Sequence, residues 1–81
     1  MTVPTHAIAM ASTTLAAAAY DDRQALLHVE FRDGTCYQYA GVPASVFRDL
    51  LSADSKGAFF NRYIRTSYRY VRLAQCAGTL I

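Results

Sequence analysis

Arginines and tyrosines alternate through the last third of the 81-residue chain. Arginine forms forked contacts with phosphate groups, and an exposed tyrosine ring stacks on an unpaired base. The pattern therefore predicts a surface that binds RNA, tRNA or another polyanion. Its candidate residues are Lys56, Arg62, Arg65, Tyr68, Arg69 and Arg72.

The charge distribution favours the same region. The chain has a net charge of only +2. Residues 1–47 carry two arginines against four acids, whereas residues 48–81 carry six basic residues against two acids. A basic C-terminal half is the electrostatic pattern expected of a polyanion-binding surface. The alternative is that these arginines form an ordinary solvated face.

Catalytic chemistry has few candidate residues. The histidines are His6, in a predicted tail, and His28, on the polar side of a predicted strand. Glu30 is an isolated acid, so the sequence indicates no carboxylate pair. With only these two histidines as possible bases, it indicates no nucleophile–base arrangement either. A tyrosine nucleophile among arginines, at Tyr63 or Tyr68, is the remaining catalytic alternative. We therefore predict a non-enzyme with no cofactor and no metal site.

The two cysteines match neither a zinc-binding spacing nor a redox motif. Cys36 lies in a predicted strand and Cys76 near the C-terminus, with 39 residues between them. The N-terminus lacks the basic start of a secretory signal, and the apolar stretch at residues 7–19 is too short to cross a bilayer. We expect no membrane association, a cytoplasmic location and reduced cysteines.

The chain is long enough for one domain. We expect a flexible tail at residues 1–11, a single domain at residues 12–73 and a second tail at residues 74–81. Apolar residues make up 53% of the sequence, which is sufficient for a core. Within the domain, residues 12–20 are predicted to be a first strand, followed by a polar turn at residues 21–24.

A β-hairpin is the clearest local prediction. Residues 25–32 alternate apolar and polar, and the strand at residues 35–40 follows the turn signal Asp33-Gly34. A three-residue loop, residues 32–34, would place Leu27 opposite Tyr39 and bring the large apolar groups to one face. Burying those groups outweighs any preference among turn types, so we predict this register, with Gly34 in the left-handed conformation.

Two short helices and a last strand complete the prediction. Pro43 suits the start of a helix that ends near residues 53–54, and Ser55 is a natural N-cap for a second helix at residues 56–65. Residues 68–73 alternate and predict another strand. The fold class is therefore α+β, with a small antiparallel sheet of three to four strands packed against two helices. The predicted core is Leu27, Val29, Phe31, Tyr39, Phe47, Leu50, Leu51, Phe60 and Ile64.

Three tyrosines have two possible roles. Tyr63 falls on the inward face of the second predicted helix and is expected in the core. Tyr37 and Tyr39 share the face of Leu27, which favours the core with the hydroxyls at its rim. The alternative for this pair is a platform on which RNA bases stack.

The order of these motifs resembles the KTSC domain, which is named for its occurrence at the C-terminus of some lysyl-tRNA synthetases and is also found as a free-standing bacterial protein. The resemblance spans about residues 27–70 and rests on the hairpin, the Tyr-x-Tyr pair, Gly-Val-Pro, Ser-Lys-Gly and the run Phe-Phe-Asn-x-x-Ile-Arg. The matching residues include Phe31, Gly34, Tyr37, Tyr39, Gly41, Val42, Pro43, Ser55, Lys56, Gly57, Phe59, Phe60, Asn61, Ile64, Arg65 and Tyr68. The resemblance implies the fold and an association with RNA, but no catalytic residues.

Two functions stay open. The first is a non-catalytic module that binds RNA or another polyanion. The second is a module for protein interaction or self-association, in which an exposed strand edge pairs with a protein partner or a second copy. Binding to a polyanion should weaken steeply with salt, whereas an interface anchored by tyrosines should weaken far less.

Overall fold

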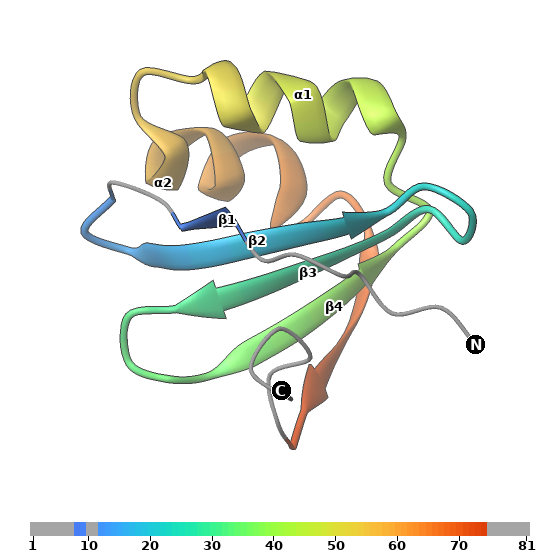
Figure 1. The fold of residues 1–81 in the computed structure, drawn as a ribbon, viewed down its shortest axis with the longest axis horizontal. Helices are drawn as coiled ribbons and strands as arrows, with labels where there is room; N and C mark the ends of the chain where they lie inside the picture. The colour runs from blue at the N-terminus through green and yellow to red at the C-terminus, as the bar shows by residue number, and fades with distance from the viewer. Residues whose placement is uncertain (1–7, 10–11, 75–81) are drawn as a thin grey trace.

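The computed structural model describes residues 8–9 and 12–74 as an antiparallel sheet with helices on one face (Figure 1). The strands are β1 (Ile8–Ala9), β2 (Leu15–Asp21), β3 (Leu26–Phe31), β4 (Cys36–Ala40) and β5 (Arg69–Leu73). They lie in the order β1-β2-β3-β4-β5, and each neighbouring pair is antiparallel. The helical segments are α1 (Ala44–Ser52), α2 (Lys56–Phe59) and the π-helical turn η1 (Phe60–Ile64).

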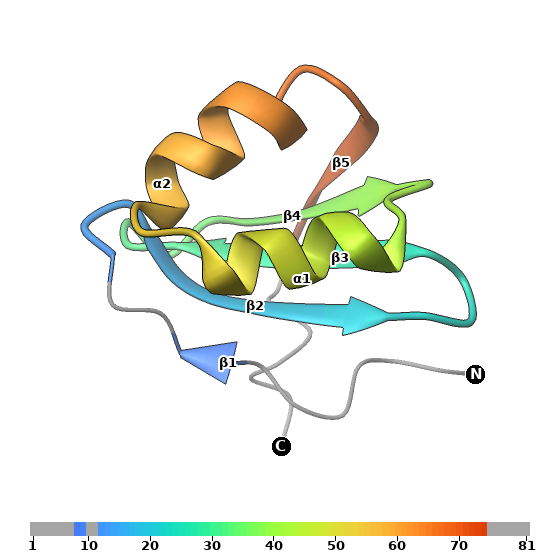
Figure 2. The ribbon, with the colours of Figure 1, turned by 90° about the horizontal axis from the view of Figure 1, so that it is seen from above.

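The predicted α+β class is confirmed. Four of the five strands are those expected from the sequence. The fifth, β1, comes from the segment predicted as a tail and pairs Ile8 with Ala18 of β2. The helical segments lie together on one face of the sheet, and β5 forms the edge opposite β1 (Figure 2).

The turn between β2 and β3 is organised by the carboxylate of Asp21, which is buried. Its Oδ1 accepts hydrogen bonds from the backbone N–H groups of Arg23 (3.0 Å) and Gln24 (3.3 Å), and Oδ2 accepts one from Gln24 Nε2 (3.2 Å). Ala25 then adopts a positive φ of 56°. A buried carboxylate satisfied in this way fixes a turn that the sequence indicated only as polar.

The β3–β4 hairpin has the predicted register. Leu27 lies opposite Tyr39, and Val29 lies opposite Tyr37. The backbone N–H of Phe31 donates to the carbonyl oxygen of Thr35 (2.8 Å), which closes a three-residue loop. Gly34 in that loop has a φ of 91°, a conformation that residues with a side chain rarely adopt.

Helix α1 begins after Pro43, whose extended backbone and fixed φ suit a helix start. Leu50 is completely buried, while Val46, Phe47 and Leu51 are partly buried and pack against the core. The ring of Phe47 stacks on Tyr20, with centroids 5.1 Å apart. The predicted apolar stripe is therefore the face that α1 presents to the sheet.

The second predicted helix is present as α2 continued by η1. The Ser55 hydroxyl oxygen accepts a hydrogen bond from the N–H of Ala58 (3.2 Å), as expected of an N-cap. Gly57 is buried against the segment just before β2, where an added Cβ would lie 3.2 Å from Thr14 Oγ1. Glycine here permits the close approach of α2 to the sheet.

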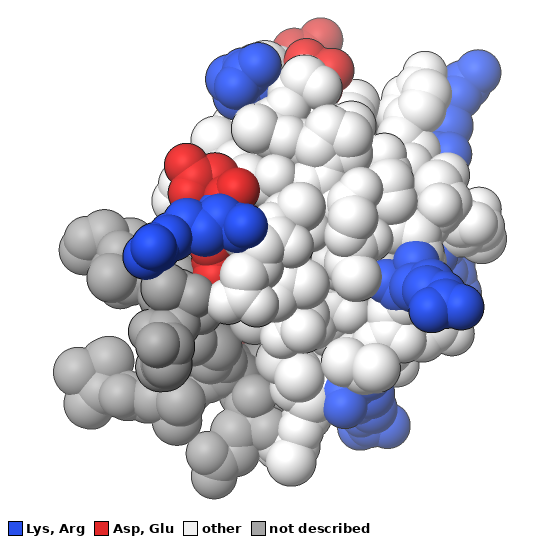
Figure 3. Space-filling model, turned by 90° about the vertical axis from the view of Figure 1, so that its right-hand side faces the viewer, with Lys and Arg blue, Asp and Glu red and all other residues white. Residues whose placement is uncertain are grey.

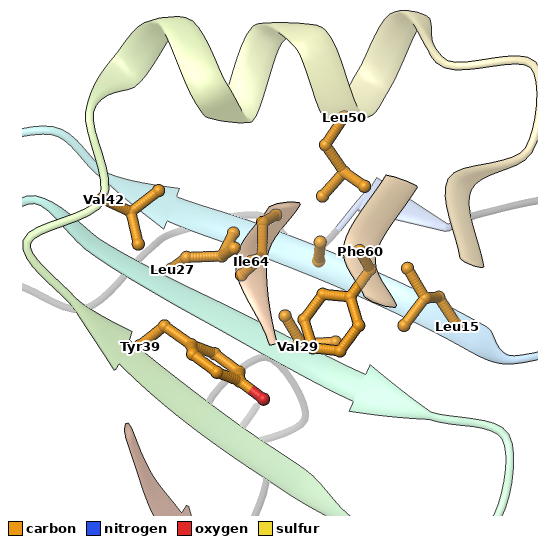
Figure 4. Packing of buried hydrophobic residues seen from close by; sticks show 9 residues of the cluster. Leu15, Leu27, Val29, Tyr39, Val42, Leu50, Phe60 and Ile64 are labelled. Atoms are coloured by element: carbon orange, nitrogen blue, oxygen red, sulfur yellow. The ribbon is translucent and has the colours of Figure 1, made fainter. Parts of the chain in front are cut away.

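The core lies between the sheet and the helices (Figure 4). All nine predicted core residues are buried in it or packed against it. Prediction missed Leu15, Ala18 and Val42, which are also buried. Leu15 and Ala18 were missed because the alanine-rich strand shows no regular alternation, and β2 contains a register shift between Leu15 and Ala17.

The expectation that Tyr63 is a core residue is wrong, because its side chain is 50% exposed. In η1 the N–H of Arg65 donates to the carbonyl oxygen of Phe60 (2.9 Å), five residues earlier. A π-helical turn contains more than four residues. Ile64, four residues after Phe60, therefore still faces the core, whereas Tyr63, three residues after Phe60, faces away from it. A regular α-helical period had placed Tyr63 inward.

The expectation of reduced cysteines is also wrong for Cys36. This residue is buried, as predicted, but it is disulfide-bonded. The other cysteine of the chain, Cys76, lies outside the described residues. Within the described part of the chain, no helix is long and apolar enough to span a membrane.

Candidate ligand groove

A groove of about 680 Å³ opens between the hairpin end of the sheet and η1. The sheet contributes side chains from β3, β4, β5 and the hairpin loop, and η1 and the segment after it contribute the opposite wall. The lining residues are Thr14, Phe31, Asp33, Thr35, Tyr37, Tyr39, Phe60, Asn61, Arg65, Thr66, Tyr68 and Tyr70. Half of them are aromatic.

Five of these rings form one connected cluster. Phe60 contacts Tyr39 and Phe31 edge to face, with centroid distances of 5.4 Å in both pairs. Tyr70 lies 5.5 Å from both Tyr37 and Tyr39. These spacings are within the range of favourable aromatic pairs, so the cluster is a packed unit that runs from the core to the surface.

Strand register explains how the tyrosines meet. Tyr39 pairs with Tyr70 across β4 and β5, and Tyr37 pairs with Arg72. Residues opposite one another share a face of the sheet, so all four side chains lie on the face that carries the helices. The helices cover only part of this face. As a result Tyr39 is 3% exposed, whereas Tyr70 is 56% exposed.

The tyrosines therefore have different roles. Burial raises the pKa of the Tyr39 hydroxyl, and the neighbouring Tyr37 and Tyr70 add to this effect while Arg65 opposes it. Tyr39 is a core residue, as predicted, and forms the floor of the groove. Tyr37 is partly buried, and Tyr70 forms an exposed wall.

Charged groups stand at the rim of the groove. Arg65 is exposed and follows η1, and Asp33 is exposed at the hairpin loop. The pKa of the Asp33 carboxyl lies below its usual value, chiefly because the Thr35 side chain and backbone donate hydrogen bonds to it and also because Arg72 is near. The groove thus has an aromatic floor with a cation and an anion at its edge.

The structure separates the predicted basic residues. Arg65 and Tyr68 line the groove, and Arg72 lies opposite Tyr37 on the same face of the sheet. By the alternation of a strand, Arg69 points to the other face, where it borders a shallow depression with Gln38 and Val71.

Arg62 and Lys56 make contacts of their own. The guanidinium carbon of Arg62 lies 5.5 Å from the ring centre of Tyr63, on the exposed side of η1. Lys56 Nζ donates to the carbonyl oxygen of Ala53 (3.0 Å), beyond the end of α1. Figure 3 shows the same dispersal on another face, where the Lys and Arg side chains lie in separate places and two of the basic groups stand beside acidic side chains.

Tyr70, Asp33 and Phe31 line the groove but are not among the site residues predicted from the sequence. The available signal was the alternation of residues 68–73, because pairing that strand with residues 36–40 puts Tyr70 beside Tyr39. The register of the β4–β5 pair is set by the path of the chain after η1, which no local pattern encodes. Among the described residues, no group of three or more metal-ligating side chains is present.

With this fold, the chain belongs to the KTSC domain family, whose model matches residues 11–68. A KTSC domain protein from Yersinia pestis has the same fold, with a TM-score of 0.81 and 30% sequence identity over 84% of this chain and 96% of that one. The family expected from the sequence motifs is therefore confirmed.

Relatives occur both as small proteins and within a larger enzyme. An uncharacterized protein from Stutzerimonas stutzeri is 42% identical over 67 residues, which cover 82% of this chain and 94% of that protein. A lysine–tRNA ligase from Nostoc punctiforme is 38% identical over 56 residues, which cover 69% of this chain but only 10% of the ligase. The similarity to the ligase is thus confined to one small segment of it.

Proposed function

We propose that this domain is a non-catalytic module that binds single-stranded RNA in the groove. The observation that carries the proposal is the aromatic wall formed by Tyr37 and Tyr70 beside Arg65. A half-exposed tyrosine that is already packed on other rings offers a base a stacking surface with little further ordering. The adjacent guanidinium offers a contact for the phosphate that follows that base.

The arrangement of charge favours a single strand over a duplex. Arg65 and Arg72 are on the groove side of the molecule, whereas Arg62 and Arg69 point elsewhere. A duplex hides its bases and is bound mainly through many phosphate contacts. Two stacked bases at roughly 1–3 kcal/mol each, with one or two phosphate contacts, correspond to an affinity between about millimolar and micromolar at low salt.

Binding fits the groove better than catalysis. Among the described residues that line it there is neither a histidine nor a cysteine. The Tyr68 hydroxyl has no imidazole or second carboxylate beside it in that lining to act as a base. The occurrence of a related segment in a lysine–tRNA ligase supports an RNA ligand, and tRNA is then one natural source of unpaired bases. We further propose that the protein is bacterial and lies in the cytoplasm. Reduced cysteines no longer support this location, because Cys36 is disulfide-bonded. The proposal therefore rests on the RNA partner.

The test compares two arginines of the same helical region. The affinity of the full chain for a fluorescent single-stranded RNA octamer is measured as salt rises from low to physiological concentration. Arg65→Ala should weaken binding about tenfold at low salt and lower the slope of log Kd against log salt by about one. Arg62→Ala removes the same charge outside the groove and should change the affinity less than about twofold.

A second test compares the RNA affinity of two tyrosine variants and does not depend on the arginines. Tyr70→Ala should weaken binding by roughly 1–3 kcal/mol, whereas Tyr63→Ala, at a similarly exposed ring, should leave it unchanged. Equal losses for the paired variants would place the RNA surface elsewhere, and absence of binding to the wild-type chain at low salt would refute the proposal.

Self-association through β5 is a second candidate function, and the exposed edge of the sheet favours it. Within the described residues β5 pairs only with β4, four of its five residues are exposed, and Val71 is 55% exposed. Antiparallel pairing of two β5 strands about Val71 would set Tyr70 opposite Arg72 of the second copy and would oppose no like charges.

Sedimentation equilibrium tests this candidate. Val71→Lys would place two like charges together at the centre of such an interface, so a dimer of the wild-type chain should dissociate. Tyr63→Lys, on η1, should not affect it. A wild-type chain that remains monomeric at about 100 μM would exclude a stable dimer at that concentration.

A further inference from the structure

The groove contains a carboxylate, which a site for phosphate alone would not need. Among the described residues, Asp33 is the acid that lines the groove, and it stands at the hairpin end, beside the aromatic cluster. Arg72 is near and partly offsets this negative charge, but a carboxylate still cannot bind phosphate, so its contribution to RNA binding comes from another part of the nucleotide. Which base this carboxylate would favour depends on the proposed function, binding of single-stranded RNA in the groove.

The Asp33 carboxylate is held in one orientation. Its Oδ1 accepts hydrogen bonds from the backbone N–H of Thr35 (3.0 Å) and from the Thr35 hydroxyl (2.7 Å). No hydrogen bond to Oδ2 is made by the described residues. A carboxylate oxygen accepts up to about two hydrogen bonds, so Oδ1 is occupied and Oδ2 can accept from a ligand.

The ionisation state of the Asp33 carboxyl group follows from the same hydrogen bonds. The hydrogen bonds from Thr35 keep the pKa of Asp33 below its usual value, so the group is ionised at neutral pH. An ionised carboxylate accepts hydrogen bonds and donates none. It will therefore select a ligand edge that carries donors and reject one that carries acceptors.

The four bases differ in this respect. The Watson–Crick edge of guanine places two donors side by side, N1–H and the N2 amino group. Adenine and cytosine place an amino donor beside a ring nitrogen acceptor, and uracil places one N–H between two carbonyl oxygens. Only guanine can approach an acceptor-only group without setting a lone pair against it. This edge is free in a single strand and occupied in a duplex, which agrees with the ligand proposed above.

We propose that the groove prefers guanine, with the base stacked on the Tyr37–Tyr70 wall and its Watson–Crick edge donated to Asp33. In this arrangement the guanine lies between Asp33 and the aromatic cluster, and the neighbouring phosphate lies on the Arg65 side. The ribose 2′-hydroxyl is another donor that Asp33 could accept. It is common to all four ribonucleotides and would give no base preference.

The test measures the binding of the full chain to oligouridine octamers that carry one central guanosine, inosine, adenosine or cytidine. The guanosine octamer should bind about five- to tenfold more tightly than the adenosine and cytidine octamers. Both guanine donors share the single free oxygen Oδ2, so we expect only the lower end of the range for a two-hydrogen-bond contact to a base. Inosine lacks the amino group and should fall between them. Asp33→Asn should remove the preference, while Asp22→Asn, which removes the same charge at the β2–β3 turn, should retain it.

Equal affinity for all the octamers would overturn the guanine preference. If Arg65→Ala still weakens binding in that case, the proposed RNA function stands without it. A loss caused by central 2′-deoxyguanosine, with no effect of inosine, would assign Asp33 to the ribose and would likewise overturn the inference. Absence of binding to every octamer would instead refute the proposed function itself.

Discussion

Exposure decides what each tyrosine of the chain does. Tyr39 is buried beneath the groove and Tyr70 stands at its rim, although the two rings are only 5.5 Å apart. Tyr20 already makes contacts within the protein, because its hydroxyl donates to the carbonyl oxygen of Val42 (2.5 Å) and its ring stacks on Phe47. Tyr63 is exposed but lies beneath Arg62, away from the groove. Only part of the tyrosine content is therefore available for a ligand.

His28 gives a prediction at the scale of a single side chain. It lies on the face of the sheet opposite the helices, its Nδ1 is buried, and no hydrogen-bond partner for that atom is present among the described residues. Burial lowers the pKa of His28 in the folded protein, and Asp21 only partly opposes this. Above the unfolded pKa of about 6.5 both states are neutral, and no stability is lost.

As the pH falls below that value, the unfolded chain binds a proton that the folded chain resists, so the free energy of unfolding should decrease until the folded pKa is passed. Urea unfolding at pH 7.5 and 5.5 measures this decrease. His28→Gln should make the decrease smaller, whereas His6→Gln, in the segment outside the described residues, should not. An unchanged decrease in His28→Gln would show that other groups cause it.

At the scale of the elements, the cap of α2 offers a matched pair of serines. The Ser55 hydroxyl accepts from the N–H of Ala58, whereas the Ser52 hydroxyl donates back to the carbonyl oxygen of Arg48 (2.9 Å) at the end of α1. Ser55→Ala should lower the free energy of unfolding by about 1 kcal/mol, because it leaves a helix N–H without its partner. Ser52→Ala should be nearly neutral, because that hydroxyl bonds to a carbonyl already within the helix.

Chemical denaturation of both variants measures the difference. A loss of equal size in the two variants would contradict the capping role of Ser55. The measurement also reports on α2 as a whole, because this short segment continues directly into η1 and carries Arg65 to the groove.

The elements could be predicted from the sequence where one local pattern determined them. The hairpin register followed from the requirement that Leu27, Val29 and Phe31 share a face with the tyrosines. The cap at Ser55 and the apolar stripe of α1 were similarly local. The π turn was not predictable in this way, because a single extra residue per turn leaves no mark in the apolar spacing. It placed Tyr63 outside the core.

The candidate site was predicted less completely than the elements. Arg65 and Tyr68 were identified from composition alone, and both line the groove. Lys56, Arg62 and Arg69 share that composition but contact other parts of the molecule. Tyr70 and Asp33 depend on how β4, β5 and the hairpin loop meet in space, so their place in the groove depends on pairings between distant segments.

At the scale of the whole molecule, charge is spread rather than concentrated. A net charge of +2 with dispersed arginines provides no strong field to attract a polyanion. In the proposed function, selectivity therefore comes from the groove, where six aromatic residues, Arg65 and Asp33 meet. This distinguishes the proposed mode from general binding to phosphate, which would recruit all the arginines alike.

The six tyrosines make the most direct test possible, because they report on the groove and on the rest of the molecule in one experiment. The ring signals of the tyrosines are followed by two-dimensional carbon–proton NMR while a guanosine-containing single-stranded RNA is added. If the groove binds RNA, the signals of Tyr37, Tyr68 and Tyr70 should shift in proportion to bound RNA, while those of Tyr20 and Tyr63 should not move. Shifts centred on Tyr63, or equal small shifts of all the rings, would contradict the assignment of the groove as the RNA-binding site.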